Sequence, residues 1–200
     1  MVRTPWGYEV EAEPIPPLID AAQYARLAGV ELTEDNTPRI QATLEAVSAA
    51  IRAYCGWHIA PVLACQARCT GNGRMLELPT LTLVSVDAIE VDGGPVDMAD
   101  VRWRECGLVR LRRGHWPADW GSVVVDFTSG YDLDQVPDIG AVVAQIASNA
   151  MAGAPGVASE RAGEVSITYN ATSYGVAGGV TLLDRDKALI APHRLPTMPR

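Results

Sequence analysis

The sequence is poor in lysine and has no long apolar run. Only Lys187 among the sixteen basic residues is a lysine, a bias that fits an arginine-favouring, GC-rich genome as well as it fits any function. No apolar run approaches the roughly 20 residues that cross a bilayer. The first residues, MVRTPWGYEVEAE, have no apolar core flanked by basic residues. We therefore expect no membrane association and a chain made in the cytoplasm.

The sequence also lacks the motifs that mark common catalytic sites. It contains no G-x-S-x-G turn, no Walker-type phosphate loop and no H-E-x-x-H motif. Its three histidines, His58, His115 and His193, stand in unrelated contexts, so no nucleophile–base pair is indicated. We therefore predict that the protein is not an enzyme and has no cofactor.

Size and charge narrow the class of protein. Two hundred residues, 48% of them hydrophobic and 20% charged, suit one globular domain with arms. The net charge of −8 makes the chain as a whole a poor ligand for nucleic-acid phosphates, although a local basic patch can still act.

The cysteines and one histidine form the nearest approach to a metal site. Cys55, His58, Cys65 and Cys69 have the residue types that zinc prefers. However, Cys65 and Cys69 are expected along one strand, where residues four apart stand about 13 Å from each other, too far for one ion. Small buried thiols in a reducing compartment are the favoured interpretation.

Two helices are predicted before the middle of the chain. Asp20 and Gln23 form a capping box ahead of a helix over residues 21–28. Thr37 is the expected N-cap of a longer helix that ends at Gly56. The inner face of this second helix is an apolar stripe of Ile40, Leu44, Val47, Ile51 and Tyr54.

Two further helices are predicted in the second half. Pro137 opens the third helix, and Thr181 with Asp184 forms a capping box for a short fourth helix that ends near Ile190. The inner face of the third helix is Ile139, Val142, Val143, Ile146 and Met151.

Between the second and third helices the hydrophobic period changes to two, which indicates strands. The segment SVVVDFT, residues 122–128, has enough continuous apolar character to be a central strand. The predicted fold class is α+β: a small helical core of three to four helices with an inserted antiparallel β unit and extended N- and C-terminal arms.

The chain is therefore expected to have four parts. Residues 1–17 form an N-terminal arm, and residues 18–152 form the helical core with the β insertion at 57–130. Residues 153–180 form a flexible connection with a strand at 164–169, and residues 181–200 form the short helix and a docking tail.

An arginine-rich hairpin is the main charged feature. Arg102 and Arg104 share one strand face, Arg110 and Arg112 share the corresponding face of the return strand, and Arg113 is adjacent. Like charges across a strand pair are mildly destabilising, so something offsets them. A solvated edge that discourages aggregation, an acidic protein neighbour and a nucleic-acid backbone all fit.

Both terminal arms carry apolar residues between prolines. The anchors are Trp6, Tyr8 and Ile15 in the first arm, and Leu189, Ile190, Leu195 and Met198 in the last. Disordered ends without a function are one interpretation. Docking onto a neighbour is favoured, because a proline-stiffened arm loses little entropy when it binds.

Taken in order, these segments resemble a known family. The two helices, LELPTLTLVSVDAIEVDG, a Trp-Pro-containing strand pair, VVVDFTSGYD, VPDIGAVVAQIASNAM and GEVSITY are similar to the head–tail connector (adaptor) proteins of tailed bacteriophages. The matching stretch covers about residues 20–169. Phe127 stands where that family usually has an aromatic residue.

The resemblance implies a structural virion protein at the head–tail junction. It implies a dodecameric ring under the portal protein that extends the DNA channel, without sequence-specific DNA binding, and joins the capsid to the next neck or tail protein. It also implies that the C-terminal segment docks into the portal through Leu182, Leu183, Leu189, Ile190, Pro192, His193, Arg194 and Leu195. The hairpin arginines are then a subunit or neck interface.

Two alternatives to a connector stay open. The first is a small cytoplasmic metal protein or enzyme that uses the Cys and His residues. The second is a nucleic-acid-binding module that uses the arginine hairpin.

Overall fold

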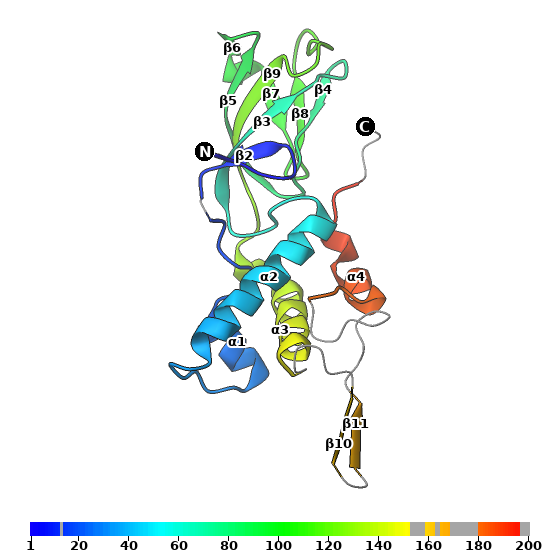
Figure 1. Ribbon diagram of the computed structural model, residues 1–200. Coiled ribbons are helices and arrows are strands. Elements are labelled where there is room, and N and C mark those ends of the chain that lie inside the picture. The colour runs from blue at the N-terminus through cyan, green and yellow to red at the C-terminus, as the bar shows by residue number, and fades with distance from the viewer. Residues whose placement is uncertain (13, 153–158, 163–164, 169–179, 197–200) are drawn as a thin grey trace. The chain divides into compact units, whose positions relative to one another are not determined.

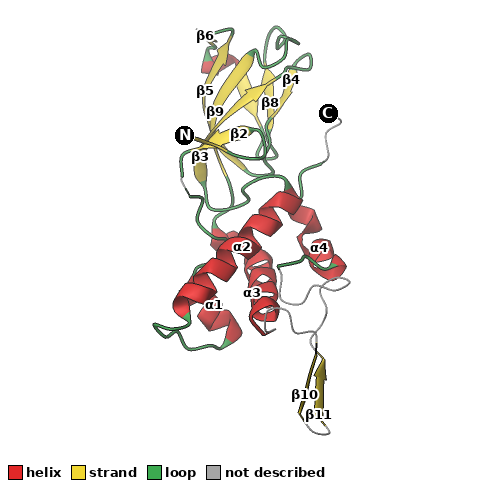
Figure 2. Cartoon of the chain, in the orientation of Figure 1, coloured by secondary structure: helices red, strands yellow, loops and turns green. Residues whose placement is uncertain are grey.

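The computed structural model describes residues 1–12, 14–152, 159–162, 165–168 and 180–196. The chain divides into two compact units. The β unit comprises Met1–Pro16, Gly56–Asp132 and His193–Arg200, and the helical unit comprises Pro17–Cys55 and Leu133–Pro192. The predicted α+β class is confirmed (Figures 1 and 2).

The first helix follows the local signals of the sequence. Helix α1 spans Ala21–Ala28, as predicted. The side chain of Asp20 accepts a hydrogen bond from the Gln23 N–H (2.6 Å), and the Gln23 side chain accepts one from the Asp20 N–H (2.9 Å). These two bonds satisfy N–H groups that the first turn of a helix leaves free, so the predicted capping box forms.

The next two helices supply most of the core of the helical unit. Helix α2 spans Thr37–Cys55 and α3 spans Pro137–Ala152. Helix α2 begins at Thr37 itself rather than after it, and Tyr54 is only half-buried while Cys55 takes the inner position. The buried side chains of the two helices include Ile40, Leu44, Val47, Ile51, Ile139, Val142, Val143 and Ile146.

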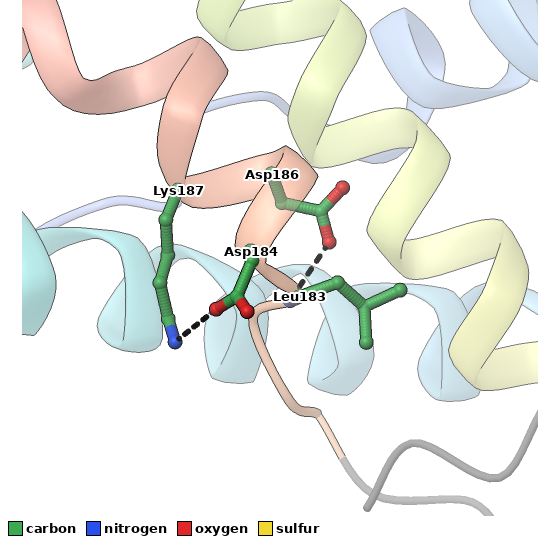
Figure 3. Close-up of polar contacts among 4 residues, drawn as sticks. All are labelled: Leu183, Asp184, Asp186 and Lys187. Atoms are coloured by element: carbon green, nitrogen blue, oxygen red, sulfur yellow. Dashed lines mark hydrogen bonds and ion pairs between the residues drawn. The ribbon is translucent and has the colours of Figure 1, made fainter.

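Helix α4 starts at a different residue from the one predicted. It spans Asp184–Ile190, and Leu183 rather than Thr181 is its N-cap. Leucine has no side-chain acceptor, so only half of a capping box forms: the buried Asp186 carboxylate accepts a hydrogen bond from the Leu183 N–H (3.1 Å; Figure 3). Lys187 Nζ lies 3.2 Å from the Asp184 carboxylate on the exposed side.

A short antiparallel pair lies between α3 and α4 in the sequence. Strand β10 spans Ser159–Ala162 and β11 spans Val165–Thr168, paired from Ser159 opposite Thr168 to Ala162 opposite Val165. The strand predicted at 164–169 therefore includes β11. Strand β10 falls in a segment predicted to be a flexible connection.

A six-stranded sheet forms one layer of the β unit. Its order is β1 (Val2–Arg3), β2 (Tyr8–Val10), β3 (Leu63–Cys69), β9 (Val123–Ser129), β5 (Leu83–Val91) and β6 (Gly94–Pro95). Neighbouring strands are antiparallel. Strand β9 lies inside the sheet, as its apolar run predicted, and its alternate residues Val123, Val125, Phe127 and Ser129 are buried.

A three-stranded antiparallel sheet forms the second layer. Its order is β4 (Met75–Glu77), β8 (Leu108–Leu111) and β7 (Val101–Trp103). Val101, Val109 and Leu76 are buried on one face. Each sheet therefore buries one face, and the buried faces form the core of a two-layer unit.

The N-terminal residues are part of this core rather than a free arm. Tyr8 pairs with Ala67 of β3 and Val10 with Cys65, and both Tyr8 and Val10 are buried. The segment predicted as an arm thus adds two strands, β1 and β2, to the sheet edge, and its prolines lie outside both strands. Trp6 and Ile15 are half-buried.

Candidate interaction surface

The hairpin arginines lie on the outer face of the three-stranded sheet. Arg102 stands directly opposite Arg110 in the register of β7 and β8. Backbone hydrogen bonds from Arg104 N to Leu108 O (2.9 Å) and from Arg112 N to Asp100 O (2.8 Å) extend the ladder by one pair at each end. Because alternate residues share a face, Arg102, Arg104, Arg110 and Arg112 form one surface, here called the arginine face.

The positive charge of this face is not neutralised within the chain. All four arginines and the neighbouring Arg113 are exposed. Among the described residues, none of these five guanidinium groups lies within 4.0 Å of a carboxylate oxygen. Arg102 donates instead to the carbonyl oxygens of Val101 (2.7 Å) and Ala99 (3.2 Å). Two carboxylates, Glu77 opposite Leu108 and Asp100 opposite Arg112, share the face, so four positive charges exceed two negative ones.

On the outer face of the six-stranded sheet, strands β9 and β5 carry an excess of negative charge. Asp126 of β9 stands opposite Ala88 of β5, and Glu90 stands opposite Val124. Asp87 occupies a register shift of β5 and accepts hydrogen bonds from the hydroxyls of Ser85 (2.8 Å) and Thr128 (3.2 Å), both of which face outward. These three residues, Asp87, Glu90 and Asp126, form the acidic face. Sequence spacing did not reveal it, because it depends on which strand pairs with which.

The loop before β9 presents a fully exposed tryptophan. Trp120 is 95% exposed. The loop is held from both sides: Gly71 N donates to Pro117 O (3.0 Å), and Gly121 N donates to Thr70 Oγ1 (3.3 Å). A side chain at Gly71 would overlap the Cβ of the buried Trp116, which explains glycine there. No pattern in the sequence had indicated Trp120.

The cysteine and histidine residues form no metal site in the described part of the chain. No group of three or more His, Cys, Asp or Glu residues there is arranged to hold an ion. Cys55, Cys65 and Cys69 are buried thiols, while Cys106 is exposed. Burial raises the pKa of Cys65 from 9.0 to about 11 and that of Cys69 from 9.0 to about 12. These thiols are therefore protonated at neutral pH, which disfavours them as nucleophiles or ligands.

His58 has a structural role in the β unit. It is fully buried, and its Nε2 lies 3.0 Å from the carbonyl oxygen of Ser129. A carbonyl oxygen only accepts hydrogen bonds, so Nε2 carries the hydrogen. In the neutral ring Nδ1 then accepts a hydrogen bond from the Tyr8 hydroxyl (2.8 Å). The same hydroxyl oxygen accepts a hydrogen bond from the His58 backbone N–H (2.9 Å). Tyr8, predicted as a docking anchor, is thus a core residue.

The residues predicted to dock into a portal divide between the two units. In the helical unit, Ile190 is buried and its carbonyl oxygen lies 3.9 Å from Cys55 Sγ, whereas Leu189 is 54% exposed. In the β unit, Trp57 Nε1 donates to the carbonyl oxygen of His193 (2.8 Å). Leu182, Leu183 and Leu195 are half-buried, and Pro192 and Arg194 are exposed. The C-terminal segment is therefore held against its own chain up to Leu195, and Met198 lies outside the described residues.

Comparison with solved structures shows what this fold is similar to. A chain in the neck of a native gene transfer agent (GTA) particle, computed with C12 symmetry, aligns with a TM-score of 0.55 and 18% identity over 96% of each chain. A chain in the neck of an empty GTA particle, computed with C6 symmetry, aligns with a TM-score of 0.57 and 19% identity, over 100% of this chain and 95% of that one. No protein-family model and no curated protein matches the sequence. The chain therefore shares its fold with chains in the necks of GTA particles.

No described helix combines the length and the apolar character of a membrane span.

Proposed function

We propose that the protein is a structural component of the neck of a phage-like particle, in which copies of the chain form a ring that connects head and tail. The observation that carries this proposal is the likeness to GTA neck chains over 96–100% of the sequence. The likeness includes both units, so it does not come from a common substructure alone. The resemblance of the sequence segments to phage head–tail connector proteins supports the same role.

The finer proposal is an adaptor under the portal, with DNA passing through the centre of a dodecamer. The C12 and C6 symmetries of the similar necks support a twelvefold or sixfold arrangement. The net charge of −8 supports a conduit, because an acidic lining repels the DNA backbone and lets it slide.

The portal contact is proposed on the exposed part of the C-terminal segment. Leu189 is the strongest candidate, because its side chain is 54% exposed on α4. Pro192 and Arg194 follow it on the surface, while Ile190 and His193 hold the segment in place. An exposed leucine on a fixed helix binds an apolar pocket at low entropic cost.

Native mass spectrometry of the purified chain with the isolated portal tests this proposal. We expect complexes with the portal that contain multiple copies of the chain. The variant Leu189→Asp is expected to weaken binding to the portal at least tenfold, because it places a charge in an apolar contact. Leu27→Asp is a matched control, since Leu27 is 56% exposed on α1 of the same unit. A wild-type chain that ignores the portal contradicts the adaptor assignment.

A second candidate function is nucleic-acid binding by the arginine face. It is favoured because the guanidinium groups of this face and of Arg113 are exposed and have no carboxylate partner among the described residues. Fluorescence anisotropy with duplex DNA at two salt concentrations tests it. Affinity that falls steeply with salt and is lost in Arg102→Glu/Arg110→Glu supports this function.

A further inference from the structure

We propose that the arginine face of one copy of this chain binds the acidic face of the next copy, and that this pairing is the contact that closes the ring. The inference rests on the proposed ring and names the two surfaces that build it. The occupant of the arginine face is therefore a second copy of the same chain.

The first support is the charge on each surface. The arginine face holds Arg102 directly opposite Arg110, an arrangement that costs stability in an isolated chain. The acidic face holds Asp87, Glu90 and Asp126; the exposed Arg68 of β3 stands opposite Val124 on the same side of the sheet, and the three carboxylates outnumber it. Each face thus has an excess of the charge opposite to that of the other face, which is the complementarity that fixes register and partner choice.

The second support is the position of the two faces. They are the outer faces of two sheets whose buried faces make one core, so they point away from each other. Figure 1 shows β5 and β6 along one side of the β unit and β4 and β8 along the other. A ring requires such a pair, because each subunit contacts its two neighbours through different surfaces.

The third support is that both faces belong to the same unit. Rotation about a ring axis keeps each part of a subunit at one height, so a surface of one β unit finds a complementary surface of a neighbouring β unit at its own height. Another exposed acidic segment, Glu31, Glu34 and Asp35 between α1 and α2, belongs to the helical unit, so it does not share a unit with the arginine face.

Apolar atoms on both faces add contact area. Met75 and Leu108 are half-buried beside the arginines. Val84 is 48% exposed and lies on β5, the strand that also carries Asp87 and Glu90. Arginine stems also cover apolar surface while their guanidinium groups bind carboxylates. The pairing therefore combines charge with burial, as protein interfaces commonly do.

Charge reversal of each face tests the proposal in the full-length chain. Sedimentation velocity measures self-association, and thermal unfolding checks that each variant is folded. We expect Arg102→Glu/Arg110→Glu alone, and Asp87→Lys/Glu90→Lys alone, to weaken association at least a hundredfold, because like charges then face each other. The control Glu34→Lys/Asp35→Lys, with the same charge change on the α1–α2 segment, is expected to assemble like the wild type.

Mixing the two reversed variants gives the decisive result. Each mutant face is then complementary to a mutant face, and each native face to a native face, so we expect alternating assemblies of equal composition by native mass spectrometry. The chain that carries all four substitutions is expected to assemble by itself. Raised salt is expected to weaken every one of these assemblies.

Three results would overturn the inference. A wild-type chain that stays monomeric at all concentrations shows that the faces do not bind each other. Reversed variants that assemble normally show that another surface closes the ring, and this leaves the proposed neck function intact if the portal still binds. Loss of assembly in the Glu34/Asp35 control alone would place the acidic partner on the helical unit.

Discussion

Replacing Tyr8 by phenylalanine tests whether the N-terminal segment is a core strand. The Tyr8 hydroxyl lies 2.8 Å from His58 Nδ1 and 2.9 Å from the His58 backbone nitrogen, in a region where both residues are buried. The Tyr8→Phe variant keeps the ring and removes both hydrogen bonds. Each lost bond costs about 1–2 kcal/mol when a buried polar partner is left behind, so the free energy of unfolding is expected to fall by about 2–4 kcal/mol.

Urea unfolding followed by tryptophan fluorescence measures this loss. All five tryptophans belong to the β unit, so the signal reports the unit that contains Tyr8. The control is Tyr131→Phe, which keeps the ring contacts of Tyr131 with Trp57 and His193 and is expected to change stability by less than about 0.5 kcal/mol. Equal stability of the two variants would refute the assignment of residues 8–10 to the folded sheet.

Three further predictions concern the β unit and its thiols. Gly71→Ala is expected to destabilise the β unit by about 2 kcal/mol or more, because the added Cβ overlaps Trp116; an unchanged urea midpoint contradicts this. A thiol reagent at pH 8 is expected to modify only Cys106 in the native unassembled chain and all four cysteines after denaturation, which mass spectrometry counts; rapid modification of a second native thiol would disagree. Cys65 and Cys69 have raised pKa values of about 11 and about 12, so their stabilisation is complete below pH 9 and is lost as pH rises toward those values. Between pH 9 and 11 the free energy of unfolding is expected to fall by up to about 1.4 kcal/mol per pH unit for each thiol, and Cys69→Ala is expected to reduce this slope.

The elements with strong local signals were predictable from the sequence. Helix α1 has the predicted bounds because its cap residues, Asp20 and Gln23, lie three positions apart and bond to each other. The hairpin of β7 and β8 was predictable for the same reason, since its strands are joined by a short turn and pair with each other.

Features that depend on distant partners were not predictable. Residues 8–10 have extended backbone whatever they pair with, and only the fold places them beside β3, more than 50 residues later. The start of α4 was wrong because Thr181 satisfies the local capping pattern, whereas the buried Asp186 carboxylate holds the actual N-cap. The acidic face likewise exists only because β5 and β9 pair in one particular register.

Only one of the two charged faces, the arginine face, was therefore predictable from the sequence. The alternating arginines are enough to identify one charged face, but they carry no information on its partner. The complementary face comes from carboxylates on strands that are not neighbours in the sequence, Asp87 and Asp126, and needs the sheet order to be recognised. The exposed Trp120 has no local signal at all, because a tryptophan is more often buried than exposed.

The central claim is that this chain forms a ring in the neck of a phage-like particle. Cryo-electron microscopy of particles that contain the chain, with the neck reconstructed, measures this directly. We predict a ring at the head–tail junction into whose subunits both the β unit and the helical unit fit, with the arginine face of each copy against the acidic face of the next. A neck whose density accommodates neither unit, in particles that contain the protein elsewhere, would contradict this claim.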